Sequence, residues 1–164
     1  MTSREEMGSW LEGSAPSTGG THRGARLGLP PDGPGSLARL GRRVAALAID
    51  WVACLAISAA FFPAAGGSGF FLSKGDPMVT LGIFALENVL LVGTVGNTLG
   101  HRILGLHVRR VVVPPAADAP TGPPHLWAAL LRTVMLCLVV PAVVWDGDGR
   151  GLHDRVAGTA IVRR

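Results

Sequence analysis

The sequence predicts an all-α integral membrane protein with two transmembrane helices and a third hydrophobic helix. Hydrophobic residues make up 48% of the 164 residues, charged residues make up only 16%, and the mean hydropathy is +0.40. The apolar residues also gather into three runs of about 20 residues, the length that a helix needs to cross the hydrocarbon core of a bilayer. A soluble domain of this size needs more polar surface, which disfavours a soluble enzyme.

The chain before the first run is rich in Gly, Pro and Ser, as in GSAPSTGG and GLPPDGPGS. Such a composition buries too little apolar surface to offset the entropy of folding, so residues 1–37 are predicted to be a disordered tail. The tail lacks the apolar core of a secretory signal peptide, so the first run is expected to act as its own insertion signal. Residues 38–164 form the predicted membrane domain.

The predicted hydrophobic segments cover residues 44–63, 78–97 and 126–145. Three Arg residues precede the first segment and three more follow the second, whereas the connection between these two segments holds a single basic residue, Lys74. The positive-inside rule therefore places the N-terminus and the second connection in the cytoplasm. The predicted location is the cytoplasmic (inner) membrane, with several passes through it.

The third segment has two interpretations. Trp127 and Trp145 bracket it at a spacing that fits two interfacial aromatic belts, which favours a full span. Four Arg residues in the tail after it favour a cytoplasmic C-terminus instead, and hence a re-entrant or interfacial segment broken near Pro141. The side of the C-terminus stays open at this point.

Ionisable residues inside these segments are the candidate functional groups, because a charge at the bilayer centre costs roughly 2.5–3.5 kcal/mol and usually faces protein or water. Asp50 and Arg132 are expected at matching depths of roughly 10 and 8 Å, which predicts an ion pair; otherwise each snorkels separately or meets a partner subunit. Glu87 is expected near the midplane, either as a proton carrier or as a protonated structural group bonded across helices with Asn88.

The sequence contains no recognisable catalytic, metal or phosphate-binding pattern. Cys54 and Cys137 lie inside apolar runs without partners at metal-ligand spacing. A calcium-loop start at Asp146 has Ala157 where the pattern requires an acidic residue. The Arg residues are not interleaved with aromatic residues as in a nucleic-acid surface. We therefore expect no enzyme activity, no cofactor, no metal and no nucleic-acid partner, and the lipid bilayer is the expected partner.

Four motifs follow one another along the chain: RVAALAID at 43–50, TLGHRILGLHV at 98–108, LRT at 131–133 and GLHDRVAGT at 151–159. Together they resemble the RDD family of bacterial membrane proteins, with Leu99 where Pro is common in the family. That family is named for an Arg at the start of the first helix, an Asp within it and a second Asp later, and the resemblance implies Arg43, Asp50 and Asp154 as these residues. If the tail is cytoplasmic, Arg43 and Asp154 can meet, and residues 106–108 and 160–162 can pair as short strands.

The resemblance implies a family of largely unknown function, with transport suspected and cation/proton antiport linked to some members. The specific function expected is therefore secondary transport of ions or small solutes coupled to protons. Three helices are too few for a usual transport path, so transport would require a homo-oligomer. The alternative is a non-transporting membrane scaffold or accessory subunit whose charges serve packing. The sequence names no substrate.

Overall fold

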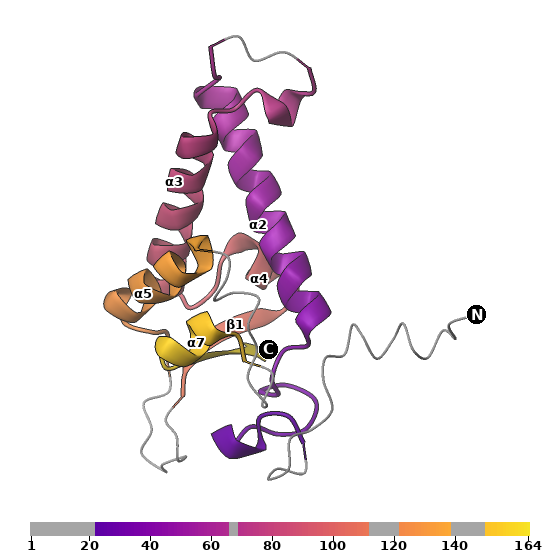
Figure 1. Cartoon of the computed structure of the whole chain (residues 1–164). Helices are drawn as coiled ribbons and strands as arrows, with labels where there is room; N and C mark the ends of the chain where they lie inside the picture. Colours follow the sequence, from indigo (N-terminus) through magenta and orange to yellow (C-terminus); the bar gives the residue numbers. More distant parts are fainter. Residues whose placement is uncertain (1–21, 66–68, 112–121, 139–149) are drawn as a thin grey trace, which may run out of the picture.

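The computed structural model describes residues 22–65, 69–111, 122–138 and 150–164. A hairpin of two helices stands above a base formed by shorter elements (Figure 1). The hairpin helices are α2 (Leu40–Phe61) and α3 (Pro77–Glu87). The base contains α4 (Leu99–Ile103), β1 (Leu106–Arg110), α5 (Leu126–Cys137), α7 (Leu152–Val156) and β2 (Thr159–Arg163), and short turns of helix lie at η1 (Ala25–Leu27) and η2 (Phe71–Ser73).

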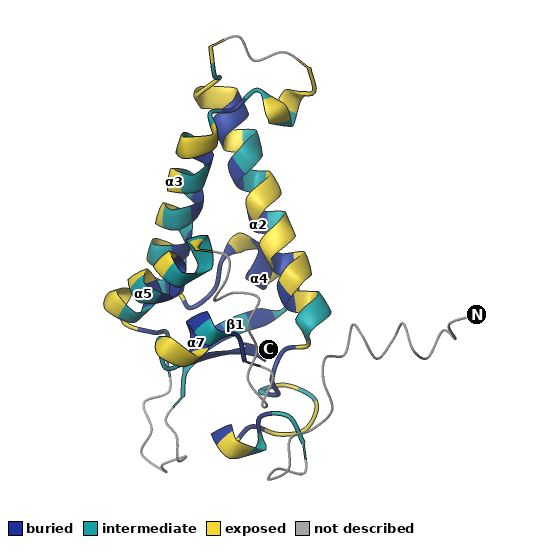
Figure 2. Ribbon diagram, viewed as in Figure 1, coloured by how far each residue is buried: buried dark blue, intermediate teal, exposed yellow. Residues whose placement is uncertain are grey.

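In the described part of the chain, α2 is the one helix long and apolar enough to cross a membrane. Its 22 residues rise about 33 Å at 1.5 Å per residue, slightly more than the hydrocarbon thickness. Large apolar side chains such as Val44 and Val52 are exposed on its outward face, and Figure 2 shows this face as a yellow stripe. Lipid is the solvent that such a face requires.

The second predicted segment forms a shorter helical stretch than expected. Asp76 caps its start by accepting hydrogen bonds from the backbone N–H groups of Met78 (2.8 Å) and Val79 (3.0 Å). Helix α3 then continues as the π-helical turn η3 (Asn88–Val92). The helical stretch Pro77–Val92 is therefore about 24 Å long, less than a full span.

The third predicted segment contains α5, whose 12 residues rise only about 18 Å. Residues 139–145 of that segment lie outside the described residues. The apolar composition thus predicts where helices form, whereas within the described residues only the first of the three predicted segments forms a helix of membrane-spanning length.

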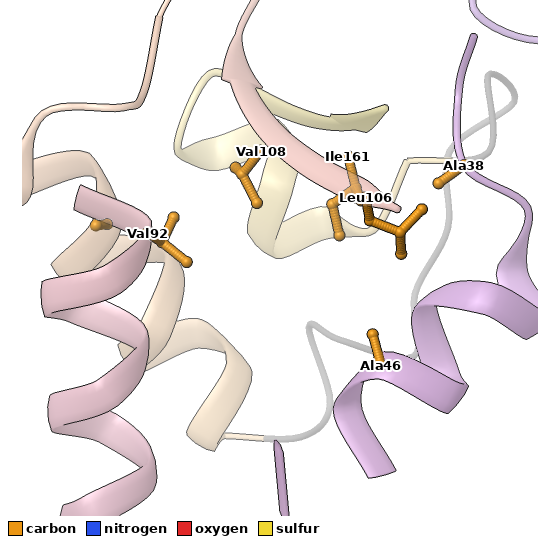
Figure 3. Packing of buried hydrophobic residues seen from close by; sticks show 7 residues of the cluster. Ala38, Ala46, Val92, Leu106, Val108 and Ile161 are labelled. Atoms are coloured by element: carbon orange, nitrogen blue, oxygen red, sulfur yellow. The ribbon is translucent and has the colours of Figure 1, made fainter. Parts of the chain in front are cut away.

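The two strands pair antiparallel, with Val108 opposite Ile161 and His107 opposite Val162. This confirms the pairing of residues 106–108 with 160–162. Alternate side chains of a strand point to opposite faces, so the sheet has two apolar faces to cover. The first packs under the helices, where Leu106, Val108 and Ile161 join Ala46, Val92 and Ala129 in the main core (Figure 3).

The second face of the sheet is covered by the segment before α2. Leu27, Leu29 and Leu37 are buried there against Ala160 and Val162. The prediction that residues 1–37 form a disordered tail is therefore wrong for residues 22–37, since three spaced Leu side chains let this Gly-rich and Pro-rich segment cover the sheet. Residues 1–21 lie outside the described residues.

The C-terminal strand lies at the same end of α2 as the first residues of that helix. The N–H of Ala38 donates to the carbonyl of Ile161 (2.8 Å), and the N–H of Gly35 donates to the carbonyl of Arg163 (2.8 Å). The chain after α5 therefore returns to the base at which α2 begins. This arrangement matches the re-entrant or interfacial interpretation of the third segment, in which the C-terminal tail lies on the same side of the membrane as the start of α2.

Candidate functional site: a buried charge cluster at the base of α2

The inward face of α2 carries a row of polar side chains. Arg43, Asp50, Cys54 and Ser58 are buried, and their spacings of seven, four and four residues place them on one face of the helix. A helix in lipid would normally bury apolar side chains against its neighbours, because each buried polar group needs a partner. We call these four residues the polar row of α2.

At the base of the row, two Arg side chains share one carboxylate. Asp154 of α7 is fully buried; its Oδ1 accepts a hydrogen bond from Nε of Arg132 on α5 at 2.7 Å and one from the hydroxyl of Thr159 at 3.2 Å. Its Oδ2 lies 3.8 Å from Nη1 of Arg43, whose Nε donates to the carbonyl of Ala38 (2.9 Å). This cluster ties α2, α5 and α7 together.

Asp154 is held in its charged form. Burial by itself raises the pKa of a carboxyl, but the positive charges of Arg132, His153 and Arg43 outweigh burial and lower the pKa of Asp154 to about 2. The carboxylate is therefore ionised at every physiological pH. The trio of Arg43, Asp154 and Arg132 carries two positive charges and one negative charge.

The ion pair predicted between Asp50 and Arg132 is wrong. Arg132 bonds Asp154 instead, because the returning tail brings that carboxylate within hydrogen-bond distance of the guanidinium. The oxygens of Asp50 are occupied by α4: the hydroxyl of Thr98 lies 2.5 Å from Oδ2, and the N–H of Gly100 donates to Oδ1 at 2.6 Å. Asp50 and Arg132 do line one cavity. Their matching depths therefore predicted correctly that the two residues lie near each other, but not which groups they bond.

The sequence Thr98–His101 builds the partner surface of Asp50. Thr98 caps α4 by accepting from the N–H of His101 (3.3 Å), and the N–H of Thr98 donates to Nδ1 of His101 (3.3 Å). Oγ1 of Thr98 also lies 2.7 Å from the same Nδ1. Gly100 permits the close approach of α4, because a Cβ there would overlap the carbonyl of Ala46.

His101 is neutral. Its ring is buried in the base, and burial together with the nearby Arg132 guanidinium lowers the pKa of His101 to about 3. A neutral imidazole keeps one nitrogen as a donor and the other as an acceptor. Because the N–H of Thr98 donates to Nδ1 of His101, this nitrogen is the acceptor of the neutral ring, and Nε2 carries the ring proton.

Glu87 lies further along the polar row, at the point where α3 changes to the π-helical turn. Its Oε2 accepts a hydrogen bond from the thiol of Cys54 at 3.3 Å. The alternative bond with Asn88 across helices is not formed, since the Asn88 amide donates to the carbonyl of Phe84 in its own helix (3.0 Å). Single π-helical turns are frequent at functional sites.

A cavity of about 80 Å³ lies where these groups converge. In the described part of the chain, Nη1 of Arg132 is buried and has no hydrogen-bond partner. A buried donor of this kind costs free energy unless a ligand or water satisfies it. The polar lining residues are Arg43, Asp50, Asn88, His101, Arg132 and His153, and the apolar ones are Val44, Leu47, Leu136 and Ile161.

The sequence reasoning found the charges of this site but missed Thr98, His101 and His153 as lining or bonding groups. Thr98 and His101 lie inside a motif that we quoted for the family resemblance, and their three-residue spacing is that of a helix cap. Within the described ranges, no group of three or more His, Cys, Asp or Glu side chains could hold a metal ion.

A comparison with protein-family profiles assigns the chain to a family. The RDD family profile matches residues 37–158, well over half of the sequence. The chain belongs to the RDD family. It is therefore a membrane protein of this family, and family membership by itself assigns it no specific activity. Searches of curated proteins and of solved structures returned no match to the chain.

Arg43 and Asp154, two of the residues that the family resemblance implies, come into contact across α2 and α7. The third, Asp50, lies two helical turns further along the same face of α2 and bonds the start of α4. These three residues thus take part in two neighbouring arrangements beside α2, one built around the carboxylate of Asp154 and the other around the hydroxyl of Thr98 and the neutral imidazole of His101.

Proposed function

We propose that the chain is a secondary transporter of ions or small solutes coupled to protons. The observation that carries this proposal is the polar row of α2, which continues from Arg43 to Ser58 along the inside of a membrane-length helix. Ionisable residues inside membrane helices are costly, and in pumps and transporters they mark ion and proton pathways.

Every member of the row has a polar partner on another element, so its polar groups are paired rather than isolated. Asp50 of the row bonds the hydroxyl of Thr98, and Cys54 of the row bonds the carboxyl of Glu87 on α3; hydroxyls, thiols and carboxyls all exchange protons. At the base of α2, Arg43 contacts Asp154, which also bonds Arg132. Asp50 bonds Thr98, which contacts His101. Toward the far end of the helix, Cys54 bonds Glu87, and Ser58 donates to the carbonyl of Asp76.

The proposal includes a homo-oligomer in the cytoplasmic membrane, with the base of the hairpin on the cytoplasmic side. Two helices shorter than a span cannot enclose a transport path together with α2, so neighbouring copies are needed to complete it. Basic residues at the base, such as Arg39, Arg42 and Arg102, support the cytoplasmic orientation.

The alternative is a membrane scaffold or accessory subunit that transports nothing. Its supporting observation is the complete burial of Asp154 between two Arg side chains, an arrangement that fastens the tail to the helices. In that case the charges serve packing, and removing a proton-exchanging carboxyl would change no flux.

Reconstituted vesicles separate these two functions. The purified chain is incorporated into vesicles that contain a pH-sensitive dye, and gradients of sodium, potassium or chloride are imposed. We expect a proton flux driven by one of these gradients, and we expect Glu87→Gln to reduce it at least tenfold. Asp32→Asn, at an exposed carboxyl remote from the row, is the matched control and should retain the flux.

An unchanged flux in Glu87→Gln would remove Glu87 from the proton path. The absence of any proton-linked flux in the folded wild-type protein, measured with all three ions, would favour the scaffold.

A further inference from the structure

The sheet at the base has an open groove on the face turned away from the main core. Leu106 and Val108 of β1 pack into that core, so His107 and Arg109, which alternate with them, point to the opposite face. Val162 lies opposite His107 on β2 and lines the same groove. We call it the basic groove. Its lining residues are His107, Arg109, Gly122, Val162, Arg163 and Arg164.

The Arg side chains of the basic groove lack acidic partners. Within the described ranges, no Asp or Glu side chain forms an ion pair with Arg109, Arg163 or Arg164. Burial, and then the guanidiniums of Arg164 and Arg109, lower the pKa of His107, which shows that these positive charges converge on its ring. The α-carboxylate of Arg164 offsets at most one of the three charges. An anion among these guanidiniums would therefore relieve their repulsion.

Two nitrogen atoms of the basic groove also lack a hydrogen-bond partner. Nε of Arg109 and Nδ1 of His107 are buried, and neither has a partner among the described residues. Nε of an Arg is always a donor, and Nδ1 of a neutral His is a donor in one of its tautomers. A buried donor without a partner costs free energy. Phosphate oxygens are the acceptors that a guanidinium binds best, so a phosphate group suits this groove.

The basic groove adjoins apolar surface of the kind that faces lipid. At one end of the groove, the N–H of Arg164 donates to the carbonyl of Gly105 (2.8 Å), two residues after the end of α4. Leu99 and Ile103 of α4 are 46% and 61% exposed, and α4 packs against α2, whose outward face is apolar as well. A ligand with a phosphate at one end and acyl chains at the other matches both surfaces, whereas a free phosphate ion matches only the groove.

We propose that the basic groove binds the phosphate-bearing headgroup of an anionic phospholipid whose acyl chains lie against α4 and the outward face of α2. The inference goes beyond the proposed function, since it uses the orientation with the base on the cytoplasmic side but requires no transport. The groove has a volume of about 410 Å³, within the roughly 300–1,000 Å³ of small-molecule sites. Anionic lipids are abundant in the cytoplasmic leaflet, at the level where the base would lie.

The test measures lipid binding to the purified full-length chain in micelles of a neutral detergent. Dioleoyl phosphatidylglycerol is the probe, and native mass spectrometry counts the lipids bound to each chain. Dioleoyl phosphatidylcholine, which has the same acyl chains but no net charge, is the comparison lipid. We expect saturable binding of a single phosphatidylglycerol, at least tenfold tighter than phosphatidylcholine. Inorganic phosphate at the same concentration should displace little of the bound lipid.

Two double variants assign the binding to the basic groove. Arg109→Gln with Arg164→Gln removes two guanidiniums beside His107 and should weaken phosphatidylglycerol binding roughly thirtyfold, about fivefold for each positive charge removed. Arg26→Gln with Arg155→Gln removes the same charge from exposed positions on η1 and α7 and is the matched control. Its affinity should stay within about twofold of the wild type, since exposed charges outside the groove are screened.

Circular dichroism checks that each variant folds. If Arg109→Gln prevents folding, Arg163→Gln with Arg164→Gln replaces it, because both positions lie at the end of β2 and line the same groove. This pair should also weaken binding roughly thirtyfold.

Three results would overturn the inference. Equal losses in the groove variant and in the matched control would mean a diffuse attraction to the basic surface. Phosphatidylglycerol binding no tighter than phosphatidylcholine binding would mean that the guanidiniums do not select the lipid. Inorganic phosphate binding as tightly as the lipid would mean a free-anion site.

The outcome is separate from that of the proposed function, because the lipid is bound in micelles without any ion gradient. Lipid binding in a chain without proton-linked flux would sustain the inference and refute transport. Flux in a chain that binds no lipid in the groove would do the reverse.

Discussion

Replacement of Asp154 by Asn is expected to be among the most destabilising single changes in this chain. Asp154 is fully buried, and Asn keeps its shape but removes the charge that Arg132 and Arg43 share. Removal of one partner from a buried ion pair typically costs about 3–5 kcal/mol, because the other charge stays buried without compensation. The same range, roughly a hundredfold to several thousandfold in the folding equilibrium, is expected here.

The measurement is equilibrium unfolding in mixed detergent micelles at neutral pH, followed by far-ultraviolet circular dichroism. Asp32→Asn removes an equal charge from an exposed position and serves as the matched control, with an expected change within about 0.5 kcal/mol. A loss of less than about 1 kcal/mol in Asp154→Asn would refute the reasoning, since it would mean that the guanidiniums do not depend on this carboxylate.

A double-mutant cycle sharpens the result. Replacing the pair by apolar residues, as Arg132→Met with Asp154→Leu, removes both charges at once, and buried pairs replaced in this way often lose little stability. We expect the double variant to be more stable than Asp154→Asn alone, and the two positions to show a coupling energy of about 1–3 kcal/mol. Additive losses would contradict a direct interaction.

Three further results are expected. The pKa of Asp154 is lowered from 3.8 to about 2, so the stability that its charge supplies is complete above pH 3.8 and is lost as the pH falls through about 2. When the free energy of unfolding is measured over this acid range, the wild type should show the loss and Asp154→Asn should not. Gly100→Ala should cost about 1–3 kcal/mol because its Cβ meets the carbonyl of Ala46, whereas Gly82→Ala, where a Cβ meets nothing within 4 Å, should cost nothing. Reporter fusions before Met1 and after Arg164 should indicate the same side of the membrane, and opposite sides would contradict the return of the tail to the base.

The sequence predicted helices better than it predicted spans. The first run became a membrane-length helix because nothing interrupts its hydrogen-bond ladder. The second run continues through apolar residues to position 97, yet its helix ends at Val92. Gly96 there takes a left-handed conformation with φ of +79°, and Gly93 lies so close to Leu126 of α5 that a Cβ would clash. Hydropathy measures apolar content and does not register where contacts with another helix end a segment.

The sequence also predicted the charged residues of the site better than their partners. Depth along the bilayer placed Asp50 near Arg132, but depth contains no information about direction around a helix axis, and α7 supplied a closer carboxylate. Thr98 and His101 escaped notice because polar residues after a hydrophobic run are ordinary loop residues in a sequence. Their importance comes from a contact with Asp50 that spans 48 residues of chain.

The two Asp residues that the family resemblance implies have different tasks in this structure. Asp154, with a pKa of about 2, cannot exchange protons near neutral pH, so its role is to hold α2, α5 and α7 together. Asp50 bonds a hydroxyl, a group that exchanges protons. Asp154→Asn should therefore fail mainly in folding, and Asp50→Asn should fold but lose proton coupling. If unfolding measurements and proton-flux measurements gave the opposite assignment, the division of tasks argued from these contacts would be wrong.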